Sequence, residues 1–377
     1  MLHAILQSSQ VIDWSHLTQL AERHSVMPLV YENISRYCAD RVPAKILLPL
    51  KQQFRANGIR NLMRTRELLT LLNELRQQGI LALPFKGPEM AVSAYGDLAR
   101  RQFSDLDILV PEVDLVRARD WFMTMGDRMK IERATLTDSQ YELFVRSPQI
   151  HRFIRECAYP FVRQSSQTVV ELHWRVMPKH FAFSIDSPAL WQNLETVSIL
   201  GEEVTKLSTE NSLLLLCGHG SKDCWDKLAR VCDIAALIHT HPELDWPFLM
   251  NRAKQLGGQR LVLLGLLLAQ MLLGTSLPPM IQEAIAADTV LPALAEETAT
   301  ALFANHASQQ PFRATQFHLK IRERWLDKAR YFSRIAMTPT TLDWQMYPRS
   351  TFPPLLYYLL RPVRLILQAR GKQLVRE

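Results

Sequence analysis

The sequence is short of cysteine, of long apolar runs and of any strong charge excess. Its 377 residues include five cysteines and no CxxC pair, which predicts reduced, buried thiols in a cytoplasmic protein rather than a disulfide framework. No run reaches the roughly 18 apolar residues that a membrane-spanning helix needs. The first residues carry neither a basic segment nor a small-residue cleavage site, so we expect no secretion signal. Hydrophobic residues make up 47% of the chain, which argues against disorder as the overall class.

Common signatures of nucleotide-dependent and hydrolytic enzymes are absent as well. The chain has no G-x-x-x-x-G-K-[ST] loop, no G-x-G-x-x-G fingerprint, no G-x-S-x-G elbow and no H-E-x-x-H pair. The sequence therefore gives no support to a P-loop protein, a dinucleotide-binding fold, a serine hydrolase of that type or a zinc protease.

The charge balance is mildly basic, because 44 Lys and Arg residues oppose 37 Asp and Glu residues for a net charge of +7. This balance permits an anionic ligand such as a nucleotide, a nucleic acid or a lipid head group, and it selects none of them. No dense stripe of Lys and Arg marks a track for a phosphate backbone, so nucleic acid is not the favoured partner.

Three regions make up most of the chain. Apolar residues recur three and four positions apart in residues 1–78, which predicts helices that stop at Gly79. Residues 79–206 read as a small α/β core. Residues 207–340, entered at Ser208, carry apolar stripes so broad that their helices must pack on one another. Helices on both sides of a small mixed β-sheet predict the α+β class.

A basic and apolar tail, residues 341–377, follows these regions. Pro362 is expected to interrupt any helix in it. Two roles stay open for the tail: docking on the protein's own helices, or an interfacial helix that makes peripheral contact with a membrane.

Strands are predicted in three segments of the core. Residues 80–85 form an apolar run that leads through Lys86-Gly87-Pro88 into a short helix ending at Tyr95. Residues 105–110 are a second strand, and residues 168–177 are rich enough in β-branched and aromatic residues to be a third.

The sharpest chemical feature is the run Ser-Asp-Leu-Asp-Ile-Leu-Val that begins at Ser104. Side chains alternate along a strand, so Asp105 and Asp107 share one face while Leu106 and Ile108 share the other. Two neighbouring carboxylates repel each other unless a cation neutralises them, and hard oxygen ligands suit Mg²⁺. The alternative is a pair of aspartates that simply ends a strand at the surface.

A third carboxylate is expected if this pair serves phosphoryl transfer with two metal ions. The best candidate is Glu171, which period two places on one strand face with His173 and Arg175. A glutamate in the core of a strand needs a partner. A metal ion is one such partner, and a salt bridge to Arg175 or another cation is the other.

The turn at Lys86 and Gly87 is a candidate phosphate site. A glycine before a helix lets backbone N–H groups approach an anion, and Lys86 adds a point charge. Arg101, four residues before Asp105, either balances the charge of the aspartates or holds a nucleotide phosphate.

The first helix of the C-terminal region carries further polar residues. Cys217, Cys224 and Cys232 lie seven and eight residues apart, so we expect them to share a helical face and pack. His219 and Lys222 lie three apart and share another face. His219 is either a satisfied core histidine or part of a site, and no zinc-ligand pattern is complete.

Taken together, these motifs resemble the uncharacterised nucleotidyltransferase family of bacterial proteins, within the DNA polymerase β-like nucleotidyltransferase superfamily. The likeness is carried by Lys86-Gly87, Tyr95, Arg101, the run from Ser104 to Val110, Glu171-Leu172-His173-Trp174, His219, Lys222, Trp225 and Asp233, and it extends to Asp13-Trp14, Arg23-His24 and Leu359-Leu360-Arg361-Pro362. Lys86-Gly87 stands where better-known members of the superfamily carry Gly-Ser.

The resemblance implies a metal-dependent nucleotidyltransferase that moves a nucleoside monophosphate from an NTP such as ATP to a hydroxyl acceptor and releases pyrophosphate. Asp105, Asp107 and Glu171 would be catalytic and hold Mg²⁺ or Mn²⁺. The residues expected to bind the nucleotide are Lys86, Gly87, Arg101, Ser104, His219 and Lys222.

Two alternatives remain on the same fold: a nucleotide-binding regulator without turnover, and a toxin-type nucleotidyltransferase that modifies tRNA. The acceptor, the preferred base and the oligomeric state do not follow from the sequence.

Overall fold

The fold is seen in a computed structural model that describes residues 12–131, 136–147, 150–152, 154, 156–181, 183, 185, 188–304, 311–346 and 356–365. Its elements up to the end of the second sheet are α2 (Trp14–Arg23), α3 (Met27–Tyr37), α4 (Ala44–Gln77), β1 (Leu83–Pro84), α5 (Pro88–Tyr95), β2 (Asp105–Leu109), α6 (Leu115–Thr124), β3 (Arg128–Met129), α7 (Asp138–Arg146), β4 (Ala158–Val162), β5 (Val169–His173), β6 (Leu194–Ile199) and β7 (Glu202–Leu207). The helices that follow are α8 (Thr209–Lys222), α9 (Leu228–Thr240), α10 (Trp246–Gln255), α11 (Gln259–Leu273), α12 (Pro279–Ala287), α13 (Leu291–Phe303), α14 (Pro311–Lys320), α15 (Trp325–Met337) and α16 (Thr341–Met346).

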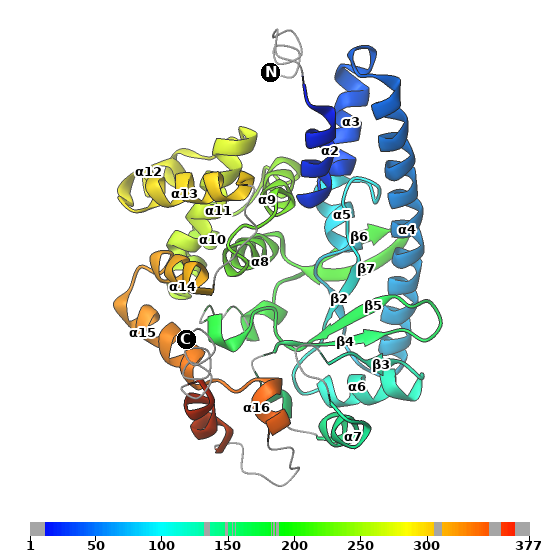
Figure 1. The fold of residues 1–377 in the computed structure, drawn as a ribbon, viewed down its shortest axis with the longest axis vertical. Helices are drawn as coiled ribbons and strands as arrows, with labels where there is room; N and C mark the ends of the chain where they lie inside the picture. Colours follow the sequence, from blue (N-terminus) through cyan, green and yellow to red (C-terminus); the bar gives the residue numbers. More distant parts are fainter. Residues whose placement is uncertain are drawn as a thin grey trace, which may run out of the picture.

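The N-terminal helices form as the periodicity predicts. Asp13 caps α2 by accepting a hydrogen bond from the backbone N–H of His16 at 2.9 Å. The long helix α4 ends just before Gly79, whose φ of +67° is the left-handed conformation that glycine adopts freely. In Figure 1, α4 runs along the whole length of the sheet.

A mixed five-stranded sheet forms the centre of the molecule, with strand order β1-β2-β5-β4-β3. β2 and β5 are parallel neighbours, and the remaining pairs are antiparallel. β1 is an edge strand, where Pro84 removes no hydrogen bond from the interior of the sheet. This sheet and the helices around it confirm the α+β class.

The alternation along β2 divides the sheet into an apolar face and a polar face. Leu106 and Ile108 pack with Val170 and Leu172 in a core that α4 and α6 complete, for example through Leu71 of α4. The opposite face turns toward the C-terminal helices α8 to α15 (Figure 1). It is this second face that carries the aspartates.

The C-terminal helices pack on one another, as their broad apolar stripes predict. Their common core includes Leu214 of α8, Ile234 of α9 and Leu264 of α11, all without measurable exposure. Ser208 caps α8 by accepting a hydrogen bond from the backbone N–H of Asn211 at 3.3 Å, so the predicted helix entry is correct.

Several local predictions need correction. The strands at residues 80–85 and 168–177 are shorter than expected, at Leu83–Pro84 and Val169–His173. The hairpin of β6 and β7 was not predicted.

The three cysteines do not share a helical face. α8 ends at Lys222, Cys224 lies in the following turn with a positive φ of 53°, and Cys232 belongs to α9. Trp225 also has a positive φ, of 54°, so the chain reverses where the sequence analysis continued one helix.

The tail is described over residues 356–365, and the rest of the tail after residue 346 lies outside the described residues. Residues 356–365 are helical through Pro362, so the expected interruption is wrong. Arg361 and Arg364 are buried and both bond the carboxylate of Asp343. In the described part of the chain, no helix combines the length and the apolar character needed to cross a membrane.

Candidate active site

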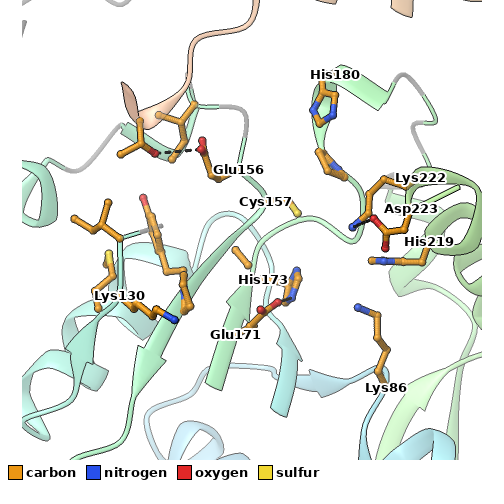
Figure 2. A pocket seen from close by; sticks show the side chains of 18 of the residues that line it. Lys86, Lys130, Glu156, Cys157, Glu171, His173, His180, His219, Lys222 and Asp223 are labelled. Carbon is orange, nitrogen blue, oxygen red and sulfur yellow. Dashed lines mark hydrogen bonds and ion pairs between the residues drawn. The ribbon is translucent and has the colours of Figure 1, made fainter. Parts of the chain in front are cut away.

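The parallel register of β2 and β5 brings the predicted carboxylates together. It pairs Asp107 with Glu171, and Leu109 with His173. The Nε2 atom of His173 lies 3.0 Å from Oδ1 of Asp107 and 3.1 Å from Oε2 of Glu171. Figure 2 shows Glu171 and His173 side by side, with the amine of Lys86 across from them. Residues 64 positions apart in the chain thus form one charged cluster on the polar face of the sheet.

The histidine in this cluster behaves as a cation. Its Nδ1 lies 3.3 Å from the carbonyl oxygen of Arg175, so both ring nitrogens face acceptors. Burial alone would lower the pKa of His173, but its hydrogen bonds to Asp107, Cys157 and Glu171 outweigh burial and raise the pKa well above the usual value. An imidazolium here neutralises part of the negative charge.

Asp107 and Asp105 differ in their electrostatic surroundings. Burial would raise the pKa of Asp107, but the ammonium of Lys86, 3.3 Å away, and the hydrogen bond from His173 together lower it below its usual range. The pKa of Asp105 is instead raised, first by burial and then by the charges of Asp107 and Glu171. Asp105 therefore lies near two other carboxylates, and the charge of Lys86 does not offset their effect on its pKa.

The alternative interpretation paired Glu171 with Arg175 or another cation. Arg175 is not the partner, but the other cation is present as His173, 3.1 Å from Oε2 of Glu171. The guanidinium of Arg175 pairs with Glu112, at 2.9 Å between Nη2 and Oε2, rather than with Glu171. The hydrogen bond from His173 is the first cause that lowers the pKa of Glu171.

The turn before α5 forms as predicted. Gly87 is the N-cap of α5 with a φ of +55° and a ψ of −124°, and Pro88 is the first helical residue. A side chain at position 87 would point to the carbonyl oxygen of Asp105, with its Cβ 3.5 Å away. The turn thus holds Lys86 beside the aspartates through backbone packing.

A cavity of about 540 Å³ opens beside this turn. It contains all nine residues that the sequence analysis singled out: Lys86, Gly87, Arg101, Ser104, Asp105, Asp107, Glu171, His219 and Lys222. Four further cations line it, Arg60, Arg64, Lys227 and Arg230. We call it the cation-lined cavity.

Arg101 lines this cavity and is held by an ion pair with Asp233. Its guanidinium bonds both carboxylate oxygens of Asp233, at 3.0 and 2.9 Å, and the hydroxyl of Tyr95 donates to the same carboxylate at 2.8 Å. The partner of Arg101 is therefore Asp233 rather than the aspartates of β2.

Both interpretations of His219 apply at once. Its Nε2 donates to the carbonyl oxygen of Val176 at 2.9 Å, so it is a satisfied buried histidine, and it also lines the cavity. Burial first, and then the charges of Lys86 and Lys222, lower its pKa well below the usual value, which keeps the ring neutral. Lys222 lies 3.4 Å from Asp223 at the end of α8.

Sequence reasoning missed the cations of α4. Arg60 and Arg64 are four residues apart and share a helix face. Arg64 donates to the carbonyl oxygen of Phe103 at 2.8 Å, while burial and the charge of Arg60 lower its pKa. The spacing of the two arginines was readable, but α4 carries arginines on several faces, so the sequence did not show which face meets the site.

The donor set fits a divalent cation. Within the described ranges, Asp107, Glu171 and His173 offer three ligand atoms that lie within 4.8 Å of one another. His173 would coordinate a metal ion only after its imidazolium loses a proton. Carboxylate oxygens suit Mg²⁺ and Mn²⁺, and an imidazole suits Mn²⁺ better than Mg²⁺. His173 was not among the predicted ligands, although period two placed it on the face of Glu171.

A mixed sheet that presents clustered carboxylates beside a glycine turn and a cation-lined cavity defines a class of protein, the enzymes that transfer phosphoryl or nucleotidyl groups. The chain belongs to the uncharacterised nucleotidyltransferase family, whose model matches residues 10–274. The matched range includes every site residue named above. A search of curated proteins and a search of solved structures gave no match.

Proposed function

We propose that the protein binds the triphosphate of an NTP in the cation-lined cavity and transfers the nucleoside monophosphate to a hydroxyl acceptor, with release of pyrophosphate. One observation carries this proposal. Among the described residues, Arg60, Arg64 and Lys227 line the cavity and form no ion pair, while a carboxylate cluster lies in the same cavity. Unneutralised cations beside carboxylates favour a ligand that is itself anionic and a cation that the carboxylates hold.

Each residue then has a chemical role. Asp105, Asp107 and Glu171 would hold Mg²⁺ or Mn²⁺, which supplies Lewis-acid charge at the phosphate when bound. Lys86 binds phosphate oxygens and stabilises the charge that develops on the leaving pyrophosphate. Arg64 binds the triphosphate equally before and during the reaction. Gly87, the N-cap of α5, places the N-terminus of that helix beside the anion.

The transfer exchanges one phosphorus–oxygen bond for another. The acceptor oxygen forms a bond to the α-phosphorus, and the bond from that phosphorus to the bridging oxygen breaks. The electron pair of the broken bond leaves with pyrophosphate, and the hydroxyl proton passes to Glu171. His173, hydrogen-bonded to Glu171 and Asp107, holds the two carboxylates in position.

The decisive test replaces Asp107 by Asn. The amide keeps the shape of the side chain but removes a charge on which the site depends, so NMP transfer from labelled NTP should fall by about 10²–10³-fold or more, with the fold retained. Undiminished transfer by this variant would remove the carboxylate cluster from the mechanism. Circular dichroism and thermal unfolding check the fold.

A second variant tests the cavity itself. Arg64→Gln should raise KM for the NTP with little change in kcat, because the side chain binds the triphosphate away from the reacting phosphorus. Arg66→Gln is the matched control, since Arg66 is exposed on the same helix and does not line the cavity. Equal KM values for the two variants would contradict the proposed phosphate site.

A further inference from the structure

A second cavity, of about 510 Å³, meets the cation-lined cavity at the carboxylate cluster. The two share Lys86, Glu171, His219, Lys222 and Asp223. Figure 2 looks into this second cavity, with Glu171 and His173 from the sheet, Lys86 from the turn before α5, and Lys222 and Asp223 from the end of α8 gathered at the junction. We call it the second cavity.

The linings of the two cavities differ in charge. Apart from the shared residues, the lining of the cation-lined cavity has five Lys and Arg side chains against three carboxylates: Arg60, Arg64, Arg101, Lys227 and Arg230 against Asp105, Asp107 and Asp233. The second cavity adds one cation, Lys130, and one carboxylate, Glu156. Much of its remaining wall is apolar or aromatic, including Met129, Ile131, Phe144, Ile154, Tyr159 and Pro160. Its chemistry fits a small organic molecule better than a polyphosphate.

The junction of the cavities lies where an acceptor has to arrive. In nucleotidyl transfer the attacking and leaving oxygens lie roughly in line on opposite sides of the phosphorus. If the cations hold the triphosphate, pyrophosphate leaves toward the cation-lined side, so the acceptor approaches from the other side. Glu171 lines both cavities, which suits a group that takes the acceptor proton.

Two buried polar atoms on the wall of the second cavity call for a hydrogen-bonding ligand. Oε1 of Glu156 accepts a hydrogen bond from the hydroxyl of Thr341 at 3.1 Å, but its buried Oε2 has no partner among the described residues. The hydroxyl of Tyr159, in a side chain with 3% exposure, likewise has none among them. An unsatisfied buried polar atom destabilises the protein, and a hydrogen-bonding group on a ligand can remove this penalty.

The charge of Glu156 decides which donor is preferred. A carboxylate oxygen accepts a hydrogen bond from an ammonium group or from a neutral hydroxyl, and the ammonium group adds the attraction between opposite charges. Lys130 carries the opposite preference, but its side chain is exposed, and solvent screens an exposed ion pair so that it contributes little. The buried acceptor therefore outweighs the exposed cation.

We propose that the second cavity is the acceptor site and that it takes a small molecule bearing both a hydroxyl and an amino group, the amino group bound by Glu156 and the hydroxyl directed at the junction. This assignment rests on the proposed function. Tyr159 and Glu156 act as specificity residues, because neither lines the cation-lined cavity.

The test uses three two-carbon probes that differ in one group: ethanolamine, ethylene glycol and glycolate. Mass spectrometry measures the NMP ester formed from NTP and each probe. We expect ethanolamine to be modified at least tenfold faster than the other two, and Glu156→Gln to abolish this preference. KM for the NTP should be the same in that variant as in the unaltered protein, because Glu156 does not line the cation-lined cavity. Equal rates for the three probes, or an unaltered preference in Glu156→Gln, would overturn the proposal.

Matched controls separate recognition from folding. Glu296→Gln changes an exposed glutamate of α13 and should behave as the unaltered protein. Tyr159→Phe keeps the ring and removes the hydroxyl that has no partner among the described residues. It should weaken ethanolamine use and leave KM for the NTP the same. Labelling of tRNA in preference to ethanolamine would show a macromolecular acceptor and would also overturn the proposal.

A binding measurement distinguishes this failure from failure of the proposed function. Saturation-transfer NMR detects ethanolamine on the protein without any NTP, and binding should be lost in Glu156→Gln and kept in Glu296→Gln. If no pyrophosphate is released from any NTP, the proposed function fails, yet the NMR result still decides what the cavity binds. Absence of ethanolamine binding to the unaltered protein would refute the assignment.

Discussion

Two buried aspartates, Asp107 in the sheet and Asp343 in α16, have pKa values shifted in the same direction but differ in their hydrogen-bond partners and in their access to a cavity. In both, burial alone would raise the pKa of the carboxyl group. Hydrogen bonds from cationic side chains, and from Thr340 in the case of Asp343, outweigh burial, and the net pKa is lowered. Asp343 is saturated: Thr340 donates twice at 2.7 Å, and Arg361 and Arg364 both bond the carboxylate. Asp107 has two such partners, His173 and Lys86, and lines a cavity.

The comparison shows that a lowered pKa does not by itself mark an active site. What separates the two aspartates is the access of a ligand to the carboxylate and the presence of further carboxylates. Asp343 has arginines that anchor the tail helix, residues 356–365. Asp107 has a second carboxylate, Glu171, across its strand pair. The first arrangement serves stability, and the second can serve chemistry.

The largest expected effect on stability comes from removing the carboxylate of Asp343. Asp343→Ala leaves Arg361 and Arg364 buried without their carboxylate, so the free energy of unfolding should fall by about 3–5 kcal/mol. Urea unfolding followed by circular dichroism measures this loss. Water-dependent pyrophosphate release per folded molecule should be retained, in contrast to Asp107→Asn. A loss of stability under about 1 kcal/mol would show that the tail helix is held by other contacts.

The apolar face beneath the site allows the next test. Leu172 is fully buried, and Leu172→Ala should lower the free energy of unfolding by about 2–5 kcal/mol through lost transfer energy and the cavity left behind. Leu81→Ala, at a leucine with 46% exposure, is the control and should change stability by about 0.5 kcal/mol or less. Similar losses in both variants would contradict the packing of Leu172 in the apolar core beneath the site.

These two faces could be predicted from the sequence because alternation along a strand is a local property. Residues 105–110 revealed which carboxylates share a face, and period two placed Glu171 and His173 together. The turn at Gly87 was equally readable, since glycine followed by proline is typical of a helix start. Local sequence patterns were therefore enough to predict the fold class and the centre of the site.

The rest depended on contacts between distant parts of the chain. Arg64 enters the site because one face of α4 meets the loop at Phe103, and no local pattern specifies that face. Glu156 and Tyr159 lie in a segment without clear periodicity, so the second cavity was not predicted. The turn that follows α8 contains two non-glycine residues with positive φ, Cys224 and Trp225. No sequence pattern indicated this turn.

A smaller effect is expected at the turn that holds Lys86. Gly87→Ala forces a side chain into a backbone conformation that favours glycine, at a cost of about 1–3 kcal/mol, although the added Cβ has room at 3.5 Å from its nearest neighbour. Gly96→Ala is the control, because Gly96 ends the same helix with a φ of +66° and no neighbour within 4 Å of an added Cβ. Both should lose stability, but Gly87→Ala alone should raise KM for the NTP. A raised KM in both variants would mean that general loosening of α5 is responsible.

The smallest effect is confined to acid pH and concerns Asp343 again. Its pKa is lower in the folded state than in the unfolded chain, where it is about 3.9, so its stabilising contribution is complete above that value and is lost as the pH falls through the folded-state pKa. Asp343→Asn lacks this titration, so its deficit in unfolding free energy against the unaltered protein should be largest near neutral pH and shrink below about pH 4. Asp40→Asn, at an aspartate with 80% exposure, should show a deficit near zero throughout. A deficit of Asp343→Asn that stays constant down to the acid transition would mean that its hydrogen bonds to Thr340 and the arginines stabilise the fold without depending on the charge, and the likeness between Asp343 and Asp107 would then end at their burial.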